Sequence, residues 1–411
     1  MAKNRDFDAD VIIVGGGPAG LGLAAILGRH GIDALCIDRE KPADTVAPAF
    51  DGRTTAISFG SRRVMEEAGA WTALADGACA IEDIQILDSN SPVLLDFLIG
   101  DVDGDAFGWI VENRHLRAAL YQAVKKSGAQ HVAPAAVTDF SRDDDGVNVH
   151  LADGRILRAP LVVGADGRQS FTRDWMDVGT RGWTYKQRAI VCTVIHGNPH
   201  NNVAIEHFRP EGPFAVLPMA DDDNGNHRSS VVWTEHGSGN HSALDYDDTT
   251  FNAALGARFP DWYGAVKLNG GRFSYPLGLV HAHNYIAPRM ALVADAAHGI
   301  HPIAGQGLNL GLRDIALLAE LLVDAKRAGT DYGSDAVLQE YQRRRRPDNM
   351  AMAAATDTLN RLFSNNVPPV RILRQIGLRL VQKTTPARKF FMRQAMGATG
   401  ALPKIIRGEK I

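Results

Sequence analysis

The chain has 411 residues, which is more than one simple core holds and indicates two or three domains. Hydrophobic residues make up 45% and charged residues 22%, as in soluble globular proteins, and the net charge of −3 argues against nucleic-acid binding. The three cysteines lack a CxxC pair or metal-ligand spacing, so we expect no metal and a reducing, cytoplasmic environment. A polar start and the lack of a long apolar run predict neither a signal peptide nor a membrane span.

The first elements in the chain predict a strand–helix–strand unit around a glycine-rich loop. The run Asp10–Val14 predicts a strand, residues 18–30 a helix, and residues 34–37 a second strand that delivers Asp38. The loop fits the pattern GxGxxG, and its glycines are Gly15, Gly17 and Gly20. The first glycine suits a tight turn, the second admits a pyrophosphate, and the third lets the helix pack on the strand. Because Asp38 could accept hydrogen bonds from a ribose, the unit predicts dinucleotide binding.

The next segments contain two polar residues that could reach a nucleotide. Arg53 lies on a loop soon after the first unit, where a surface cation is the default and contact with a cofactor or substrate is the alternative. Asn113 lies at the start of a helix that we expect to continue to Lys126. Residues 132–150 indicate strands, with the acidic run at 143–146 as a hairpin turn.

A further buried strand, Leu161–Gly167, carries an acid, Asp166, at its carboxyl end. Ligands of open α/β folds bind at the carboxyl ends of the strands, so we predict that Asp166 belongs to the same site. Residues 83–98 alternate in places and predict strands of a different sheet. From 181 to 272, short β-prone runs alternate with polar turns, which predicts an inserted, mainly antiparallel sheet.

The stretch from Ala291 to Asp314 predicts a buried strand, a turn and a helix. The strand reaches an acid, Asp295, and three glycines follow within seven residues at positions 305, 307 and 311. Glycine at this density lets backbone N–H groups approach a ligand, and a nearby helix N-terminus favours negative charge. With the N-terminal motif, this stretch predicts a second part of one nucleotide site.

The C-terminal part predicts helices with an uneven charge. A helix is expected from Ala336 to Arg346, ending before Pro347, where the four arginines suit the helix dipole. Residues 361–411 carry eleven Lys and Arg against one acid, Glu409. This charge indicates either a solvated helical face or contact with an acidic partner or anionic membrane surface.

The three strand ends, in this order and spacing, resemble the flavin-dependent aromatic hydroxylases of the para-hydroxybenzoate hydroxylase type. The loop GGGPAG looks like the ADP-binding motif of that family, and residues 163–167 look like its DG motif. Asp295 looks like the acid of its GD motif, in which Ala294 takes the place of the glycine. Within that superfamily, residues 301–314 are similar to the hallmark of the ubiquinone-biosynthesis hydroxylases of the UbiH and UbiF type.

The resemblance covers essentially the whole chain and implies an α/β fold with three parts. A discontinuous, Rossmann-like FAD-binding domain would comprise residues 1–82, 108–180 and 273–346. A substrate-binding domain built on a mainly antiparallel sheet would comprise residues 83–107 and 181–272, followed by a C-terminal helical region at 347–411. The resemblance implies bound FAD, transient NADH or NADPH, and a flavin C4a-hydroperoxide formed with O2 that hydroxylates a polyprenylated phenol or quinol of ubiquinone biosynthesis.

The resemblance also implies roles for individual residues along the cofactor. The ADP half would lie on the GxGxxG glycines and Asp38, the pyrophosphate near Asp166 and the ribityl chain on Asp295. Pro302, Gly305 and Gln306 would form the catalytic surroundings of the flavin ring. The full set expected to bind the cofactor is Gly15, Gly17, Gly20, Asp38, Arg53, Asn113, Asp166, Asp295, Pro302, Gly305, Gly307, Leu308 and Asn309.

A base that deprotonates the phenol would assist such a reaction. His298 and His301 are the nearest candidates in sequence, although a structural hydrogen bond is the favoured interpretation for each. A poorly soluble substrate also implies collection from a membrane or a multi-enzyme complex, for which the basic tail is a docking surface.

Three other functions compete with hydroxylation. A related scaffold could reduce isoprenoid chains, or serve as a flavin-bearing structural subunit of a quinone-biosynthesis complex. A flavin halogenase is disfavoured because the chain lacks a WxWxIP motif.

Overall fold

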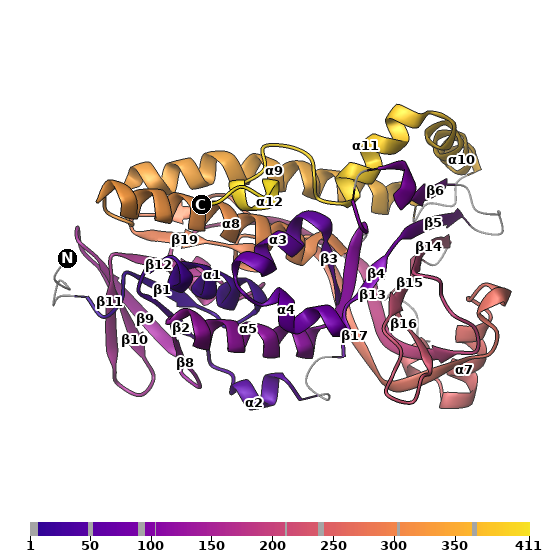
Figure 1. Cartoon of the computed structure of the whole chain (residues 1–411), viewed down its shortest axis with the longest axis horizontal. Coiled ribbons are helices and arrows are strands. Elements are labelled where there is room, and N and C mark those ends of the chain that lie inside the picture. The colour runs from indigo at the N-terminus through magenta and orange to yellow at the C-terminus, as the bar shows by residue number, and fades with distance from the viewer. Residues whose placement is uncertain are drawn as a thin grey trace.

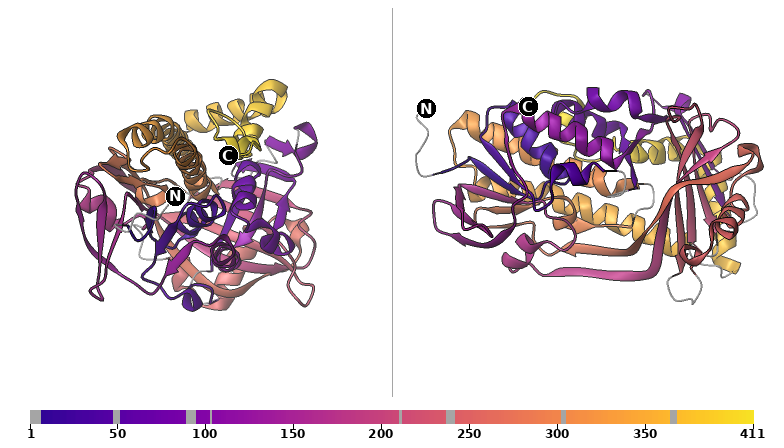
Figure 2. Two further views of the ribbon diagram at one scale, coloured as in Figure 1. Left: turned by 60° about the vertical axis from the view of Figure 1, so that its left-hand side comes forward. Right: turned by 90° about the horizontal axis from the view of Figure 1, so that it is seen from below.

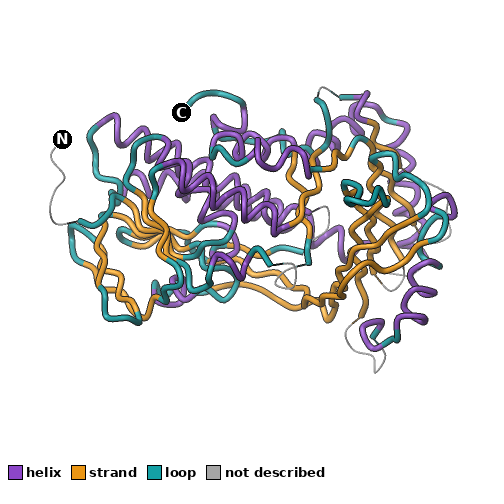
Figure 3. Tube along the Cα trace, turned by 60° about the horizontal axis from the view of Figure 1, so that its bottom comes forward, coloured by secondary structure: helices purple, strands orange, loops and turns teal. Residues whose placement is uncertain are grey.

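The structure, a computed structural model, describes residues 7–47, 52–88, 95–102, 104–209, 212–236, 242–301, 305–363 and 368–411. The molecule is elongated, with one sheet near each end and helix α9 running along the top between them (Figure 1). Seen as a tube, the strands gather at these two ends and the long helices lie along one side (Figure 3).

The first sheet is a six-stranded Rossmann-like sheet. Its strands, in spatial order, are β18 (Ile286–Ala287), β19 (Met290–Leu292), β12 (Leu161–Gly164), β1 (Val11–Val14), β2 (Ala34–Ile37) and β8 (Gln130–Val132). All are parallel except β18. The central strands β1, β2 and β12 are wholly buried, as continuous apolar runs in a parallel sheet require.

Four helices and a small sheet complete this core. Helix α1 packs against both α5 and α8, and α8 packs against α9. The bounds are α1 (Pro18–Arg29), α5 (Asn113–Ser127), α8 (Gln306–Ala328) and α9 (Asp335–Phe363). The antiparallel strands β9 (Val137–Arg142), β10 (Val147–Leu151) and β11 (Ile156–Ala159) add Phe140, Val147 and Val149 to the same core.

The second large sheet has eight strands and is antiparallel except where β14 pairs with β5, which confirms the expected inserted sheet. Residues 83–98 supply two of its strands, as predicted. Its order is β20 (His298–Gly299), β17 (Val266–Ala282), β13 (Thr180–His196), β16 (His227–His236), β15 (Gly212–Met219), β14 (Val203–Arg209), β5 (Asp83–Asp88) and β6 (Leu95–Leu98).

Two strands of this sheet, β13 and β17, have 17 residues each and run from one end of the molecule toward the other (Figure 2). One face of the sheet packs on helix α7 through Ile205, Val216 and Trp233. The other face packs on the C-terminal region, because Ala204 belongs to a cluster with Met392 and Met396. The bounds of α7 are Asp248–Gly256.

A three-stranded sheet lies between the two halves and consists of β3 (Thr54–Ser58), β7 (Gly108–Glu112) and β4 (Cys79–Ile81). The remaining helices are short or C-terminal. They are α2 (Pro42–Thr45), α3 (Phe59–Glu67), α4 (Trp71–Leu74), α6 (Phe171–Trp175), α10 (Pro368–Lys383), α11 (Thr385–Ala395) and α12 (Lys404–Arg407).

The expected end of a helix before Pro347 is wrong, because α9 continues through that proline to Phe363. A proline inside a helix removes one backbone hydrogen bond and costs about 3 kcal/mol. The cost is offset by Arg345, one of the four arginines expected at a helix end. Its guanidinium is 2% exposed and donates to Asp314 and to Asp348 on the far side of Pro347.

Candidate flavin site

The predicted strand ends lie along one edge of the six-stranded sheet. Register places Val14 beside both Ile37 and Gly164, and Gly164 beside Leu292. The loops that leave these strands are also bonded to one another, since the Gly15 N–H donates to the Ile37 carbonyl at 2.8 Å. Four neighbouring strands span roughly 14 Å, which suits an extended dinucleotide. The sheet therefore brings the GxGxxG loop and the three acids into one row.

The GxGxxG loop is built so that side chains would block it. Gly15 has φ +112°, and a Cβ there would lie 2.4 Å from the Ala165 carbonyl oxygen. A Cβ on Gly20 would lie 1.9 Å from the Gly15 carbonyl oxygen, so the third glycine allows helix α1 to close on the loop. Gly17, the N-cap of α1, faces open space, which leaves the helix N-terminus accessible to a pyrophosphate. This cradle fits the diphosphate of FAD.

Asp38 lies against this loop at the end of β2. A Cβ on Gly16 would approach Asp38 Oδ2 to 2.2 Å. The other oxygen, Oδ1, accepts the N–H of Glu40 at 3.0 Å. The carboxylate is thus held at the loop by its own chain, in the position from which it would bind a ribose hydroxyl.

Asp166 holds its own loop together. One oxygen accepts the Thr172 N–H at 2.8 Å and the Thr172 hydroxyl at 2.9 Å, and the other accepts the Ser170 hydroxyl at 2.5 Å. These bonds fix the residues at the start of α6. The carboxylate therefore shapes the turn at which the predicted pyrophosphate contact would lie.

Ala294 occupies the position of the glycine in the GD motif, and its backbone explains why glycine is expected there. Its φ is +53°, in the left-handed region that costs an alanine about 1 kcal/mol. Gly311 of α8 lies opposite, where a Cβ would come within 2.6 Å of the Ala294 Cβ. The methyl group of Ala294 is therefore accommodated by a glycine in the facing helix.

Asp295 follows in the same turn and is solvent accessible. Dense protein surroundings nevertheless raise its pKa, and His298, Arg168 and Arg53 act in the opposite direction. An accessible carboxylate with these neighbours is suited to accept hydrogen bonds from a polyhydroxy chain.

A buried network that sequence reasoning did not identify anchors this turn to α8 and α9. Asp314 accepts the Ala294 N–H at 3.0 Å, His298 Nε2 at 2.6 Å, Arg345 Nε at 2.8 Å and Asn349 Nδ2 at 3.0 Å. Burial opposes ionisation of Asp314, but His298 and Arg345 outweigh it and hold its pKa well below the usual range. The only sequence signal was Asp314 as the last residue of the hallmark motif.

The two candidate histidines are buried. His298 has 0% side-chain exposure and its Nε2 is bound to Asp314, which gives it a structural contact. His301 lies edge-on to Tyr185, with ring centroids 5.1 Å apart. Burial lowers the pKa of His301 to about 4, so its ring is neutral at physiological pH.

The start of α8 is clamped to β3. Asn309 Oδ1 accepts the Ser58 N–H at 3.0 Å, while its Nδ2 donates to the carbonyls of Ala56 and Gly305 at 2.8 and 2.9 Å. The side chain of Asn309 is thus engaged in the scaffold. Gly305 has φ +61° and Gly307 faces open space, so the backbone here remains approachable.

Other predicted positions fall as follows. Gln306 is buried at the start of α8, Leu308 is half-buried, and Pro302 lies outside the described residues. Asn113 accepts the Thr55 hydroxyl at 2.6 Å, and its N–H donates to the Arg53 carbonyl at 3.1 Å. Asn113 therefore braces β3, the strand to which Asn309 also binds.

Strand β3 links the flavin motifs to the eight-stranded sheet. The guanidinium of Arg53, just before β3, lies 4.6 Å from the ring centroid of Tyr275 in β17. The hydroxyl of Thr54 donates to Ser230 of β16 at 2.8 Å. Arg53 is exposed. It lies where the eight-stranded sheet meets the strand that follows the cofactor motifs.

Two arginines after the DG motif also join the motifs. Arg173 donates to the Ala296 carbonyl at 3.1 Å, and Arg168 donates to the Gly278 carbonyl of β17. Strand β17 in turn pairs with β20, so the turn after Asp295 continues as an edge strand of the eight-stranded sheet.

Comparison with known proteins agrees with this geometry. The family model described as FAD binding domain matches residues 8–356. The chain belongs to this FAD-binding family. It is 45% identical to ubiquinone hydroxylase UbiL of Rhodospirillum rubrum, over 99% of this chain and 95% of that protein. It is 33% identical to 3-demethoxyubiquinol 3-hydroxylase of Escherichia coli, over 94% of this chain and 98% of that protein.

Among solved structures, p-nitrophenol 4-monooxygenase from Pseudomonas putida has the same fold as this chain. The TM-score is 0.78 at 22% identity, over 96% of this chain and 98% of the other. Among the helices that the structure describes, none combines the length and apolar character needed to cross a bilayer.

Proposed function

We propose that the protein is an FAD-dependent monooxygenase that uses NAD(P)H and O2 to hydroxylate the aromatic ring of a polyprenylated phenol in ubiquinone biosynthesis. The observation that carries this proposal is the 45% identity to a ubiquinone hydroxylase over 99% of the chain. The presence of all three cofactor motifs along one sheet edge supports it.

The proposal assigns the cofactor to the residues of this edge. The GxGxxG glycines and Asp38 would hold the ADP half, Asp166 would shape the pyrophosphate turn, and Asp295 would bind the ribityl chain. Residues 305–309 would border the flavin ring together with Pro302. We retain the proposed domain division, in which residues 1–82, 108–180 and 273–346 bind FAD, and 83–107 and 181–272 bind substrate.

The chain itself supplies positioning and electrostatics. Bound FAD would supply the transfer of electrons from NAD(P)H and the activation of O2, which no side chain can perform. The N-terminus of α8 offers N–H groups and a positive dipole end, which stabilise negative charge on a ring held there. The clamps from Asn309 and Asn113 to β3 keep that helix end and the sheet face in fixed register.

The test is an assay of purified, FAD-loaded protein with NADH or NADPH, O2 and a short-chain prenylphenol. We expect substrate-dependent NAD(P)H oxidation and a product heavier by one oxygen atom in mass spectrometry. A product reduced in its prenyl chain would replace this proposal with an isoprenoid reductase. Bound FAD without substrate-dependent oxidation would favour a structural subunit.

The C-terminal helices support a second part of the proposal, contact with a membrane surface. Helices α10 and α11 expose four large apolar side chains, Ile376, Leu380, Phe390 and Phe391. Several of the basic residues counted in the sequence are neutralised by acids, for example Arg374 by Asp88 and Arg388 by Asp101.

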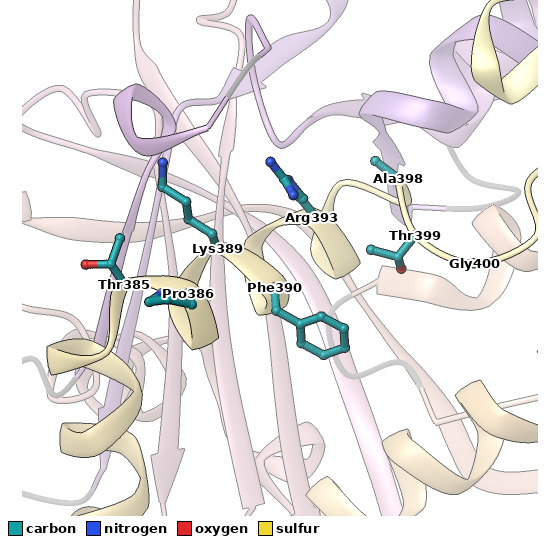
Figure 4. Close-up of a pocket in the computed structure, with 8 residues that line it drawn as sticks. All are labelled: Thr385, Pro386, Lys389, Phe390, Arg393, Ala398, Thr399 and Gly400. Carbon is teal, nitrogen blue, oxygen red and sulfur yellow. The ribbon is translucent and has the colours of Figure 1, made fainter.

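On α10 and α11, Arg379, Lys383, Lys389 and Arg393 make no ion pair with an acid among the described residues. Lys389 and Arg393 line a surface pocket with Phe390, and their side chains point to the same side of α11 (Figure 4). The pocket is formed by the C-terminal region and contains none of the flavin-site residues. Apolar and cationic groups together suit an anionic lipid surface, from which the enzyme would collect its substrate. Docking to a multi-enzyme complex is the alternative use of this surface.

A further inference from the structure

A carboxylate without an ion pair among the described residues lies on the face of the eight-stranded sheet that β3 and the C-terminal region meet. Glu206 lies in β14 between Ala204 and Phe208, and side chains two apart in a strand share a face. Ala204 packs with the cluster that includes Met392 and Met396, and Phe208 stacks on Phe363 of α9 at 3.6 Å between ring centroids. Glu206 therefore points to the side of the sheet opposite α7.

Apolar residues flank Glu206 along its row of the sheet, that is, the line of residues that lie opposite one another on neighbouring strands. Register places it beside Ile86 of β5 and Ala215 of β15, and the row continues through Val232 to Val191. Val191 and Val232 belong to the apolar cluster that also contains Tyr185 and Tyr275. This row thus leads across the sheet to the two tyrosines that touch His301 and Arg53.

The row of Glu206 also lies between the two places where β3 meets the sheet. On β16, Ser230, which binds Thr54, lies two residues from Val232 and thus one row away on the same face. On β17, Tyr275, which contacts Arg53, lies one row away in the other direction. From β16 to β14 is two strands, or roughly 10 Å. That span is on the scale of one substituted aromatic ring.

Glu206 makes no hydrogen bond or ion pair with the part of the chain that the structure describes, yet it is partly accessible to solvent. The other charged groups at this face are Asp88 of β5, one row away and paired with Arg374, Asp357 beside Tyr185 with its partner Arg361, and Arg53. None of them offsets the effect of burial, which raises the pKa of Glu206 to about 7. A carboxylate without a partner in such surroundings indicates a ligand that supplies one.

We propose that Glu206 is a catalytic residue that binds the phenolic hydroxyl of the substrate and accepts its proton. The O–H bond of the phenol breaks, the proton moves to a Glu206 oxygen, and the electron pair stays on the phenolate. Electron density in the ring rises, which favours attack on an electrophilic oxygen. This role rests on the proposed hydroxylase function.

Proton uptake on binding tests the proposal without turnover. The FAD-loaded protein is titrated calorimetrically at pH 8 with a prenylated nitrophenol, in two buffers of different ionisation enthalpy. At that pH the free probe and the free Glu206 side chain are both mostly ionised. If they share one proton in the complex, binding takes up about one proton per probe from the buffer. Glu206→Gln should show almost none. Equal proton uptake by both proteins would overturn the proposal.

The pH dependence of turnover is the second readout. Only ionised Glu206 accepts a proton, so the wild-type rate should rise with pH through about 7. In Glu206→Gln we expect kcat about a hundredfold lower at pH 7 and no rise there, with a smaller deficit at high pH, where the phenol ionises unaided. Glu206→Asp should restore part of the rate. An unchanged pH profile in Glu206→Gln would refute the role.

The matched control is Glu66→Gln, which neutralises an exposed glutamate on α3 that pairs with Arg62. It should keep the wild-type proton uptake and pH profile. FAD content and thermal unfolding establish that each variant is folded. Absence of hydroxylation in the wild-type protein would instead contradict the proposed function, which separates the two failures.

Discussion

At the scale of single residues, Ala294 and Gly311 form a compensating pair. The left-handed turn before Asp295 favours a glycine, yet here it carries an alanine, and the glycine stands opposite it in α8. The two backbones can approach because only one of the two positions bears a Cβ. The methyl group of Ala294, where the GD pattern has a glycine, is therefore accommodated by the absence of a side chain at Gly311.

This pairing predicts a rescue experiment. Gly311→Ala should lower the free energy of unfolding by about 1–3 kcal/mol, because overpacking exceeds the roughly 1 kcal/mol that alanine gains in a helix. Adding Ala294→Gly should restore stability, since the double variant again has one Cβ at the contact. Chemical denaturation of the four proteins gives the coupling energy.

The control for this cycle is Gly377→Ala in α10, where no atom would lie within 4 Å of the added Cβ. It should be neutral or stabilising, whether or not Ala294 is changed. Strictly additive effects of Ala294→Gly and Gly311→Ala would show that the two residues do not compensate.

The sequence predicted which residues gather at the site better than what each side chain does there. Glycines and strand-end acids carry local signals, because turn geometry and strand ends are properties of short segments. Asn309 and Asp166 are predicted to bind the cofactor, and the structure shows that their side chains also hold the scaffold. Such partners lie up to 253 residues away, as for Asn309 and Ala56, and no local pattern encodes them.

At the scale of elements, α8, α9 and the turn after β19 are joined by the Asp314 network. The helix end expected before Pro347 is wrong for the same reason, because a charged run before a proline has the local pattern of a helix end whatever partners it finds elsewhere. Its partners come from another helix, and the resulting buried ion pairs let α9 continue through Pro347. Strands and long helices were predicted well because their apolar periodicity is local.

Removal of one partner from this network should be costly. Asp314→Asn should lower the free energy of unfolding by about 3–5 kcal/mol, because the buried guanidinium of Arg345 would lose one of its two carboxylate partners and the buried ring of His298 would lose the carboxylate bound to its Nε2. Differential scanning calorimetry or urea denaturation would measure the loss.

Asp324→Asn provides the comparison, since that acid pairs with Lys404 at the surface and should contribute less than about 1 kcal/mol. If the two variants were equally stable, the network would not be an energetic anchor for the turn.

At the scale of the whole molecule, the exposed face of α10 and α11 lies at the same end as the eight-stranded sheet (Figure 1). A surface that binds lipid at this end would bring the substrate sheet close to the membrane. The tail is also part of the main core, because α12 buries Ile405 and Ile406 there. Point variants are therefore better probes of docking than truncation.

The docking proposal predicts a charge-dependent association with vesicles. Lys389→Glu combined with Arg393→Glu should weaken sedimentation with phosphatidylglycerol vesicles by roughly thirtyfold or more, since each cation near such a surface contributes about 1 kcal/mol. Phe390→Ser combined with Phe391→Ser should weaken it as well, through loss of apolar insertion.

A control pair, Lys125→Glu with Lys126→Glu, reverses two exposed charges on α5 and should leave sedimentation unchanged. Equal sedimentation of all variants would exclude lipid docking through α10 and α11. Capture of a purified quinone-biosynthesis enzyme by the same face would then assign it to a complex.

The order of strands has a consequence for synthesis of the chain. Strand β12 pairs with β19, so Val162 cannot pair with Met290 until the ribosome has made the segment between them. At about 5–20 residues per second, the ribosome needs roughly 6–25 s to make the intervening segment. Throughout that interval the edge of β12 that β19 will cover is unpaired, and such an edge can recruit other chains. The nascent protein is therefore most exposed to aggregation while its substrate sheet is being made, and its nucleotide half closes only when residue 292 has emerged.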